Sequence, residues 1–209
     1  MRALLLIDLQ NDFCENGALE VQNAIKSVEK ANELMPLFDF VVATQDWHPG
    51  NHGSFAANNP WRKPGQVIDL DGLPQILWPI HCVQNSFGAK FHKKLHVEKI
   101  DSVVRKGTDV NIDSYSGFFD NGKRKQTELN QILQQKGITE LYVMGVATDY
   151  CVQFTVLDAL SLGYKTFLIE DASFGVNLEP NDVNLAIENM VSHGALLAQT
   201  HDIQSLDFA

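Results

Sequence analysis

The sequence predicts an α/β protein with a doubly wound, mostly parallel six-stranded sheet, helices on both faces and Rossmann-like layering. Two observations carry this prediction. Short runs rich in Val, Ile and Leu alternate along the chain with longer amphipathic runs, and the short runs lack the polar alternation of half-exposed strands. Helices that lead into strands through short glycine-containing turns are typical of right-handed strand-helix-strand units, which build an open parallel sheet.

The elements can be placed in order along the chain. The apolar runs predict strands over Ala3–Asp8, Phe40–Gln45, Ser102–Lys106, Leu141–Val146, Thr166–Glu170 and Ala195–Gln199. The amphipathic runs predict helices over about Val21–Met35, Gln126–Lys136, Tyr150–Leu162 and Asn181–His193. The third helix has apolar residues at helical spacing and ends before Gly163, a residue type common just past helix ends.

One segment departs from this alternation. Residues 48 to about 100 show weak periodicity and hold five of the seven prolines. So long an irregular stretch in a compact domain is usually functional. Because no repeat or linker divides the chain, we predict a single domain over residues 1–209 with a long ligand-binding loop region at about 48–100.

Composition narrows the class of protein. A chain of 209 residues with 44% hydrophobic and 20% charged residues is typical of a soluble globular domain. The net charge of −10 argues against nucleic-acid binding. Three scattered cysteines do not make a disulfide framework, and no apolar run reaches the length of a signal-peptide core or of a membrane span. We therefore expect a cytoplasmic enzyme or binding protein with neither membrane nor nucleic-acid partners.

Reactive side chains fall where predicted strands end. Asp8 follows "ALLLI", Asp46 follows "VVATQ", Lys106 follows "SVVR", and Cys151 lies just past "LYVMGV". In open α/β sheets, ligands bind outside the carboxyl ends of the strands. We therefore expect these four side chains to converge at one edge of the sheet.

The four residue types suit acyl transfer through a thioester. Cys151 would open a helix, whose dipole, together with a nearby Lys106 ammonium, would favour the thiolate. Asp8 could move protons between the sulfur and a leaving nitrogen. Backbone N–H groups at the helix start could hold an oxyanion. Taken singly, an aspartate after a strand is often a helix cap and a lysine is usually solvated, so spacing alone leaves the assignment open.

A second constellation indicates a metal site. Asp46 and His48 lie in "QDWHPGNHGSF", and His81 lies in "WPIHC". A carboxylate with two imidazoles suits a divalent Zn, Fe or Mn ion with open coordination positions, although a D-x-H pair is commonplace. The remaining histidines are expected in loops or on the surface: His52, His92, His96, His193 and His201.

Motifs of other enzyme classes are missing from the sequence. There is no GxGxxG after the first strand and no GxxxxGK[ST], so dinucleotide or nucleotide phosphate binding lacks its motif. The GxSxG elbow of serine hydrolases is also missing.

Several longer motifs together resemble the nicotinamidases of the isochorismatase-like cysteine hydrolase family. They are "LLIDLQNDFC", "TQDWHPGNHGSF", "WPIHCVQ", "DSYSGFFDNG" and "GVATDYCV", and the resemblance runs from Arg2 to about Gly194. It implies the α/β fold of that family and a triad of Asp8, Lys106 and Cys151. It also implies metal ligands Asp46, His48 and His81. Ser54 falls where some relatives supply a fourth ligand, but serine is a poor ligand and water would fill the remaining positions.

The resemblance further implies details of the pocket and the reaction. A cis peptide between Val146 and Ala147 would aim the N–H groups of Ala147 and Cys151 as an oxyanion hole. Substrate would lie among Phe13, Trp78, Tyr115 and Tyr150. The implied reaction is hydrolysis of nicotinamide, and of pyrazinamide, to the acid and ammonia, which feeds NAD salvage. The pyridine nitrogen would bind the metal and place the carboxamide beside Cys151.

Two alternatives stay open. Another amidase of the same superfamily, acting on a ureido or carbamoyl substrate, would keep the triad but would have less reason to keep the metal ligands. A catalytically silent metal-binding or regulatory protein would tolerate loss of Lys106 or Cys151, so the intact set argues against it. A homo-oligomer is also left open.

Overall fold

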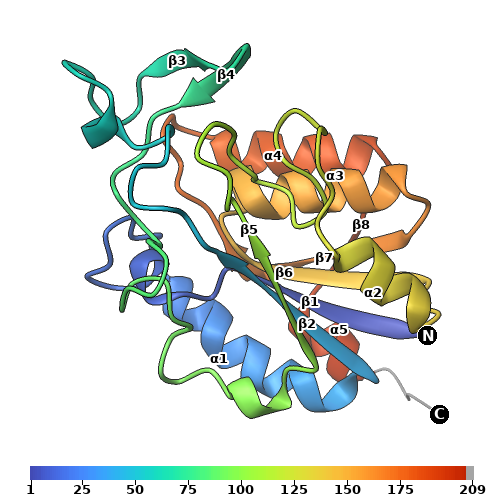
Figure 1. The fold of residues 1–209 in the computed structure, drawn as a ribbon. Helices are drawn as coiled ribbons and strands as arrows, with labels where there is room; N and C mark the ends of the chain where they lie inside the picture. Colours follow the sequence, from blue (N-terminus) through green and yellow to red (C-terminus); the bar gives the residue numbers. More distant parts are fainter. Residues whose placement is uncertain (206–209) are drawn as a thin grey trace.

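The computed structural model describes residues 1–205 and has a six-stranded parallel sheet at its centre (Figure 1). The strand order is β5-β2-β1-β6-β7-β8, and every neighbouring pair is parallel. The strands are β1 (Arg2–Ile7), β2 (Phe40–Asp46), β5 (Ser102–Lys106), β6 (Glu140–Val146), β7 (Lys165–Phe174) and β8 (Leu196–Ala198). All six predicted strands are thus confirmed, and so is the doubly wound α/β class.

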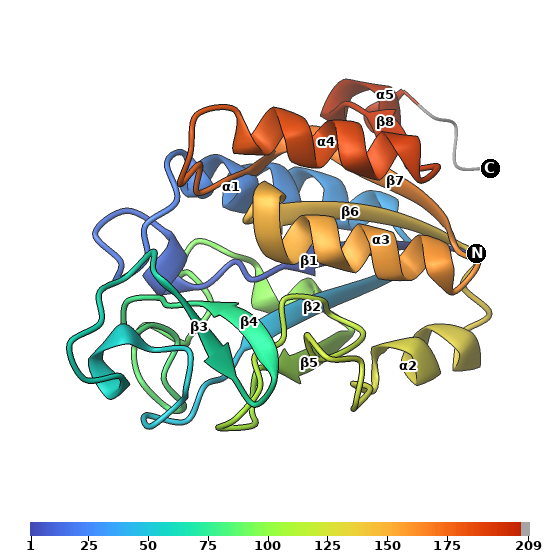
Figure 2. The ribbon, with the colours of Figure 1, turned by 90° about the horizontal axis from the view of Figure 1, so that it is seen from above.

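Helices cover both faces of the sheet because its central strands are buried on both sides (Figures 1 and 2). In β1, Leu4 and Leu6 pack into one apolar core, and Leu5 and Ile7 pack into the other. The first core is closed by α1 (Ala24–Leu34) and α5 (Thr200–Gln204). The second is closed by α2 (Leu129–Gln135), α3 (Gln153–Ser161) and α4 (Asp182–Ser192). Successive side chains on a strand point to opposite faces, which produces this division.

The helices are shorter than the sequence predicts. Asn23 has a left-handed backbone (φ 66°), so α1 begins at Ala24 and not at Val21. A π-helical turn, Thr148–Val152, precedes α3 where a regular helix start was expected. The short helix α5 was not predicted. No helix within residues 1–205 is both long and apolar enough to cross a membrane.

The proline-rich segment is less irregular than predicted. It contains an antiparallel hairpin of β3 (Val67–Leu70) and β4 (Leu73–Ile76), which stands off the main sheet (Figure 1). Asp71 and Gly72 turn the hairpin with φ values of 52° and 82°. An Asp-Gly pair between two apolar runs is a known hairpin signal, so this element was readable from the sequence.

Close backbone packing brings β1 and β6 together near their carboxyl ends. Gly145 has φ 124°, and a Cβ there would lie 2.2 Å from the carbonyl oxygen of Ile7. Only glycine fits such an approach. The chain segments that follow these two strands, and the side chains on them, are therefore held side by side.

Candidate active site

The four side chains predicted at strand ends do converge. Asp8 directly follows β1, Asp46 and Lys106 are the last residues of β2 and β5, and Cys151 lies in the turn after β6. These four strands are neighbours in the sheet, in the order β5-β2-β1-β6. One ligand atom from each of Asp8, Asp46 and Cys151 lies within 4.8 Å of the others.

Lys106 lies at the centre of this group and is 2% exposed. Its ammonium donates to Asp46 Oδ1 at 2.5 Å, to the Ser114 carbonyl at 3.0 Å and to Cys151 Sγ at 3.3 Å. A lysine ammonium has three N–H groups, so these bonds use all of its donors. Although burial opposes the charge, the carboxylates of Asp46 and Asp8 hold the pKa of Lys106 well above its usual value.

One carboxylate oxygen of Asp8 makes no hydrogen bond. Its Oδ1 accepts a hydrogen bond from the Thr44 hydroxyl at 2.6 Å. Its Oδ2 lies 2.9 Å from Lys106 Nζ but makes no hydrogen bond. Burial, only partly offset by Lys106, raises the pKa of the Asp8 carboxyl to about 6. A buried acceptor without a partner calls for an explanation, and the thiol of Cys151 is a suitable donor.

Lys106 favours the thiolate of Cys151, as expected, but its effect is outweighed by burial. Burial raises the pKa of the thiol well above its usual value, even though Lys106 acts in the opposite direction. The reason is that Lys106 is already paired with two carboxylates, and both Asp8 and Asp46 oppose a third negative charge. The arrangement therefore suits a neutral thiol that loses its proton to a base during attack.

The turn that carries Cys151 also contributes backbone groups. The peptide bond between Val146 and Ala147 is cis, as the resemblance implied, and both Ala147 and Cys151 line the pocket. The Asp149 carboxylate accepts the N–H groups of Val176 and Asn177 at 3.0 and 2.7 Å. These bonds hold the loop after β7 against the turn and place Val176 in the pocket wall.

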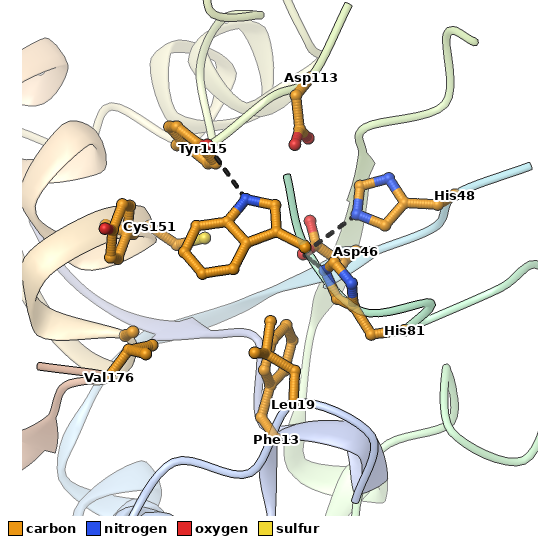
Figure 3. Close-up of a pocket in the computed structure, with 12 residues that line it drawn as sticks. Phe13, Leu19, Asp46, His48, His81, Asp113, Tyr115, Cys151 and Val176 are labelled. Carbon is orange, nitrogen blue, oxygen red and sulfur yellow. Dashed lines mark hydrogen bonds and ion pairs between the residues drawn. The ribbon is translucent and has the colours of Figure 1, made fainter. Parts of the chain in front are cut away.

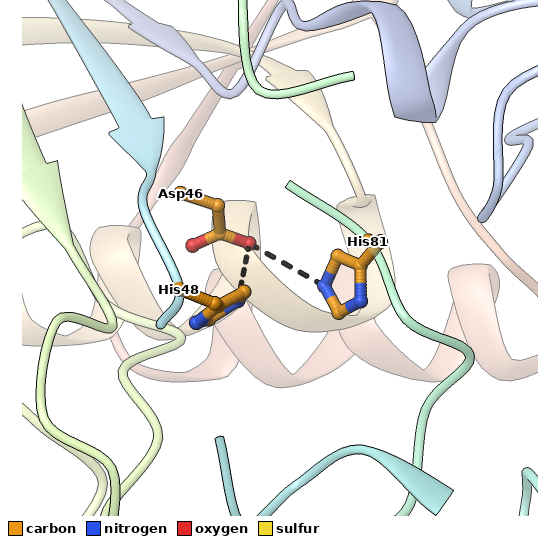
Figure 4. A group of neighbouring side chains, drawn as sticks. All are labelled: Asp46, His48 and His81. Atoms are coloured by element: carbon orange, nitrogen blue, oxygen red, sulfur yellow. Dashed lines mark ion pairs between the residues drawn. The ribbon is translucent and has the colours of Figure 1, made fainter. Parts of the chain in front are cut away.

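Asp46, His48 and His81 form a compact cluster beside the triad (Figure 4). Asp46 Oδ2 lies 3.5 Å from His48 Nε2 and 3.8 Å from His81 Nε2. The Nδ1 atoms of the two imidazoles each lie 2.8 Å from a backbone carbonyl, that of Gly107 for His48 and that of Pro79 for His81. A carbonyl can only accept, so Nδ1 carries the proton, and a neutral Nε2 can offer its lone pair.

This donor set fits a divalent cation. Atoms that bind one zinc at about 2.0–2.2 Å lie roughly 3–4 Å apart, as Asp46 Oδ2 does from each histidine Nε2. The pKa values of the two histidines also fit a cation at this site. Burial lowers the pKa of His81 to about 4. At His48 the Asp46 carboxylate outweighs the effect of burial and raises the pKa to about 9. A cation would take the place of the proton that Asp46 otherwise favours on His48. Asp46 links the two constellations, since its Oδ1 binds Lys106 and its Oδ2 faces the histidines.

His52 lies in a loop, one of the two expected locations, but it is not on the surface. Its side chain is fully buried, and its ring packs on that of His48 with centroids 4.6 Å apart. Its Nδ1 lies 2.7 Å from the hydroxyl of Ser54. The tight turn that begins at Pro49, whose carbonyl accepts the His52 N–H, folds the imidazole inward. The Ser54 hydroxyl is thus bonded to His52, whose ring packs on that of His48.

An aromatic pocket connects the thiol with the histidine cluster (Figure 3). The Trp78 indole donates to the Tyr115 hydroxyl at 3.1 Å and packs edge-to-face on Tyr150, with centroids 4.9 Å apart. Phe13 packs edge-to-face on His81. The pocket is lined by Phe13, Leu19, Asp46, His48, Trp78, His81, Asp113, Tyr115, Ala147, Tyr150, Cys151 and Val176.

Residues 2–202 match the family model described as the isochorismatase domain. The chain belongs to the isochorismatase family. It is 53% identical over 203 residues to a nicotinamidase of Escherichia coli, covering 94% of this chain and 93% of that protein.

Solved structures of isochorismatase-family relatives have the same fold. A nicotinamidase/pyrazinamidase of Acinetobacter baumanii superposes with a TM-score of 0.93 at 42% identity, covering 97% of each chain. A pyrazinamidase of Pyrococcus horikoshii, solved in complex with zinc, superposes with a TM-score of 0.77 at 38% identity, covering 95% of this chain and 98% of that one.

Sequence reasoning missed several residues of this isochorismatase-family site. Leu19, Asp113 and Val176 line the pocket. Val176 follows β7, and a prediction that extended this strand beyond Glu170 would have placed the residue at the ligand-binding edge. Asp113 lies in the quoted "DSYSGFFDNG" motif but was given no role.

A further missed residue, Gln75, is the single buried residue of the hairpin strand β4. Its amide nitrogen contacts the Tyr115 hydroxyl at 3.0 Å and Asp113 Oδ2 at 3.3 Å. Gln75 thereby joins the hairpin to the aromatic wall of the pocket. Because this role depends on the hairpin, it could not be assigned without that element.

Proposed function

We propose that this chain hydrolyses nicotinamide to nicotinate and ammonia through a cysteine thioester, and that it also accepts pyrazinamide. The product feeds NAD salvage. The observation that carries this proposal is one aromatic pocket lined by Cys151 and by the cluster of Asp46, His48 and His81. Buried Lys106 contacts both the Cys151 thiol and the Asp8 carboxylate. The identity of 53% to a curated nicotinamidase supports the same reaction.

In the first half of the reaction, Asp8 acts as the base for Cys151. Its Oδ2, which makes no hydrogen bond, takes the thiol proton while Sγ attacks the carboxamide carbon. The backbone N–H groups of Ala147 and Cys151 would hold the oxyanion of the tetrahedral intermediate. Asp8 then gives the proton to the amide nitrogen, the C–N bond breaks, and ammonia leaves a thioester on Cys151.

The second half reuses the same groups. A water attacks the thioester carbon as Asp8 takes one of its protons. The C–S bond breaks, the proton returns from Asp8 to Sγ, and nicotinic acid is released, which ionises to nicotinate in solvent. Lys106 keeps its contacts with Asp8 and Cys151 throughout, so its positive charge stabilises the negative charge that moves between carboxylate and sulfur.

Asp46, His48 and His81 would hold a divalent cation, with Zn, Fe and Mn as the candidates. When bound, such an ion supplies a Lewis acid that binds nitrogen or oxygen lone pairs at the pocket wall. The chain's own contribution is to fix the ligands, since Gly107 and Pro79 orient the two imidazoles. Gly107 is required for this, because a Cβ there would lie 2.4 Å from the His48 ring.

We also propose that residues 1–209 form one hydrolase domain in which the segment at about 48–100 binds metal and substrate. This segment supplies His48, Trp78 and His81 to the pocket, and the family model spans the sheet and the segment together. Phe13, Trp78, Tyr115 and Tyr150 would enclose the pyridine ring.

The decisive experiment is to measure ammonia release by the purified protein from nicotinamide and from a ureido or carbamoyl compound, each with and without a chelator. We expect rapid release from nicotinamide and its loss after chelation, because the aromatic walls and the metal cluster suit a ring with a nitrogen donor. Faster release from the ureido compound would identify a different amidase of the family. No release from either would indicate a catalytically silent protein.

Nicotinamide hydrolysis should weaken as the pH falls through about 6. The base must be ionised to take the thiol proton, and burial raises the pKa of Asp8 to about this value. Above it, kcat/KM should be level, and below it kcat/KM should fall by about tenfold per pH unit. The profile is measured at saturating metal between about pH 5 and 8. A level profile down to about pH 5 would assign the base role to another group.

A further inference from the structure

Thr44 lies in the middle of the active-site edge without having been assigned a role. It is the fifth residue of β2, is fully buried, and contacts Asp8 from the neighbouring strand. We propose that Thr44 is a positioning residue that locks the Asp8 carboxylate with its Oδ2 toward Cys151. This inference rests on the proposed role of Asp8 as the base.

The Thr44 hydroxyl holds Asp8 at two points. Thr44 Oγ1 accepts the backbone N–H of Asp8 at 3.1 Å and donates its own proton to Asp8 Oδ1 at 2.6 Å. Asp8 needs such support, because it has a left-handed backbone with φ 52°, a region that non-glycine residues enter infrequently. One hydroxyl thus fixes both the backbone and the carboxylate plane of the proposed base.

Fixing Oδ1 determines which oxygen is free to react. The three N–H groups of Lys106 are bonded to Asp46, Ser114 and Cys151. Asp8 Oδ2 therefore has an ion pair but no hydrogen bond. If the carboxylate rotated, Oδ1 would lose its donor and Oδ2 would move out of its ion pair with Lys106. The Thr44 bond is what opposes this rotation.

Thr44 is itself held rigidly. β2 is paired on both sides, with β1 and with β5, so its backbone cannot shift. The methyl group faces Gly117, where a Cβ would lie only 3.0 Å from Thr44 Cγ2. A β-branched side chain has few rotamers, and this contact leaves the hydroxyl directed toward Asp8.

The test compares two pairs of proteins, and within each pair only one member has the hydroxyl at position 44. The first pair is the wild type and Thr44→Val, and the second is Thr44→Ser and Thr44→Ala. Thr44→Val keeps the shape of the wild-type threonine and removes the hydroxyl. Thr44→Ser and Thr44→Ala both lack the methyl and differ from each other in the hydroxyl alone. Each full-length variant is assayed for kcat and KM on nicotinamide and for the rate at which iodoacetamide alkylates Cys151, read by mass spectrometry. Thermal unfolding is followed in parallel.

We expect Thr44→Val to lower kcat by about 10²-fold with KM within about twofold, because a misplaced base affects the chemical step. Alkylation of Cys151 should slow by about tenfold, since it also needs the thiol proton removed. Thr44→Ser should stay within about threefold of wild type, and Thr44→Ala should resemble Thr44→Val. If Thr44→Val does not fold, the serine and alanine pair carries the same comparison.

The proposal would be overturned by wild-type kcat in Thr44→Val, or by equal losses in Thr44→Ser and Thr44→Ala. The second result would show that packing of the methyl, and not the hydroxyl, matters at this position. Alkylation separates this proposal from the proposed function. If the wild type released no ammonia from nicotinamide, the function would fail, and the alkylation rates would still decide whether Thr44 sets the reactivity of Cys151.

Discussion

Replacing Cys151 with alanine is expected to reduce nicotinamide hydrolysis by roughly 10⁴-fold or more, since loss of a nucleophile removes the covalent route entirely. The protein should stay folded. The substitution leaves one N–H of Lys106 without its sulfur acceptor, which costs about 1–3 kcal/mol of unfolding free energy. Activity is measured as ammonia release, and folding is followed by thermal unfolding.

Cys14 provides the matched control. It is a buried thiol like Cys151, 2% exposed, but it packs in the apolar core and does not line the pocket. Cys14→Ala should keep activity close to wild type. All three cysteines lie in the described part of the chain, and of these only Cys151 lines the pocket. Iodoacetamide should therefore label Cys151 first. Preferential labelling of Cys14 or Cys82, or retained activity in Cys151→Ala, would refute the nucleophile assignment.

Replacing His48 with alanine is expected to abolish metal binding and to lower kcat/KM for nicotinamide by roughly 10²–10³-fold. The reason is that only two of the three proposed ligand atoms would remain, Asp46 Oδ2 and His81 Nε2, which lie 3.8 Å apart. Alkylation of Cys151 should continue, because the contacts among Asp8, Lys106 and Cys151 do not involve the imidazole. Elemental analysis measures the metal content of both proteins.

Substrate choice gives a second measure of the same site. Nicotinamide and pyrazinamide have a ring nitrogen meta to the carboxamide, and benzamide has none. Wild-type protein should therefore prefer nicotinamide to benzamide, and His48→Ala should lose most of this preference. His96→Ala is the control, since His96 is an exposed histidine outside the pocket. Full activity in metal-free protein, or equal rates on the two amides, would remove the metal from the proposed function.

The sheet was predictable because its strands are buried on both faces. Each appears in the sequence as a short apolar run, and all six runs became strands of one parallel sheet. Strand β7 runs on to Phe174, four residues past its predicted end. The three residues directly after Glu170, Asp171 to Ser173, are polar or small and gave no apolar signal. The hairpin of β3 and β4 was missed because its strands are half exposed, although its Asp-Gly turn was visible.

The site was predictable to the extent that its residues lie at strand ends. Asp8, Asp46 and Lys106 meet because parallel strands place their carboxyl ends at one edge. Thr44 could not be found this way, since it lies inside an apolar strand and its partner is 36 residues away in sequence. His52 could not be found either, because a loop histidine is buried or exposed according to how the loop folds.

By itself the sequence determined the fold class and the residue types at the site, because apolar periodicity and strand-end position are local properties of the chain. Only the tertiary structure decided their charge states. The sequence placed near Cys151 a cation that favours the thiolate, yet this Lys106 is shared with Asp8 and Asp46 in a buried cluster. Ionisation depends on burial and on the sum of neighbouring charges. Both are set by residues far apart in sequence, so the resting thiol and its base became visible only once the strands were assembled.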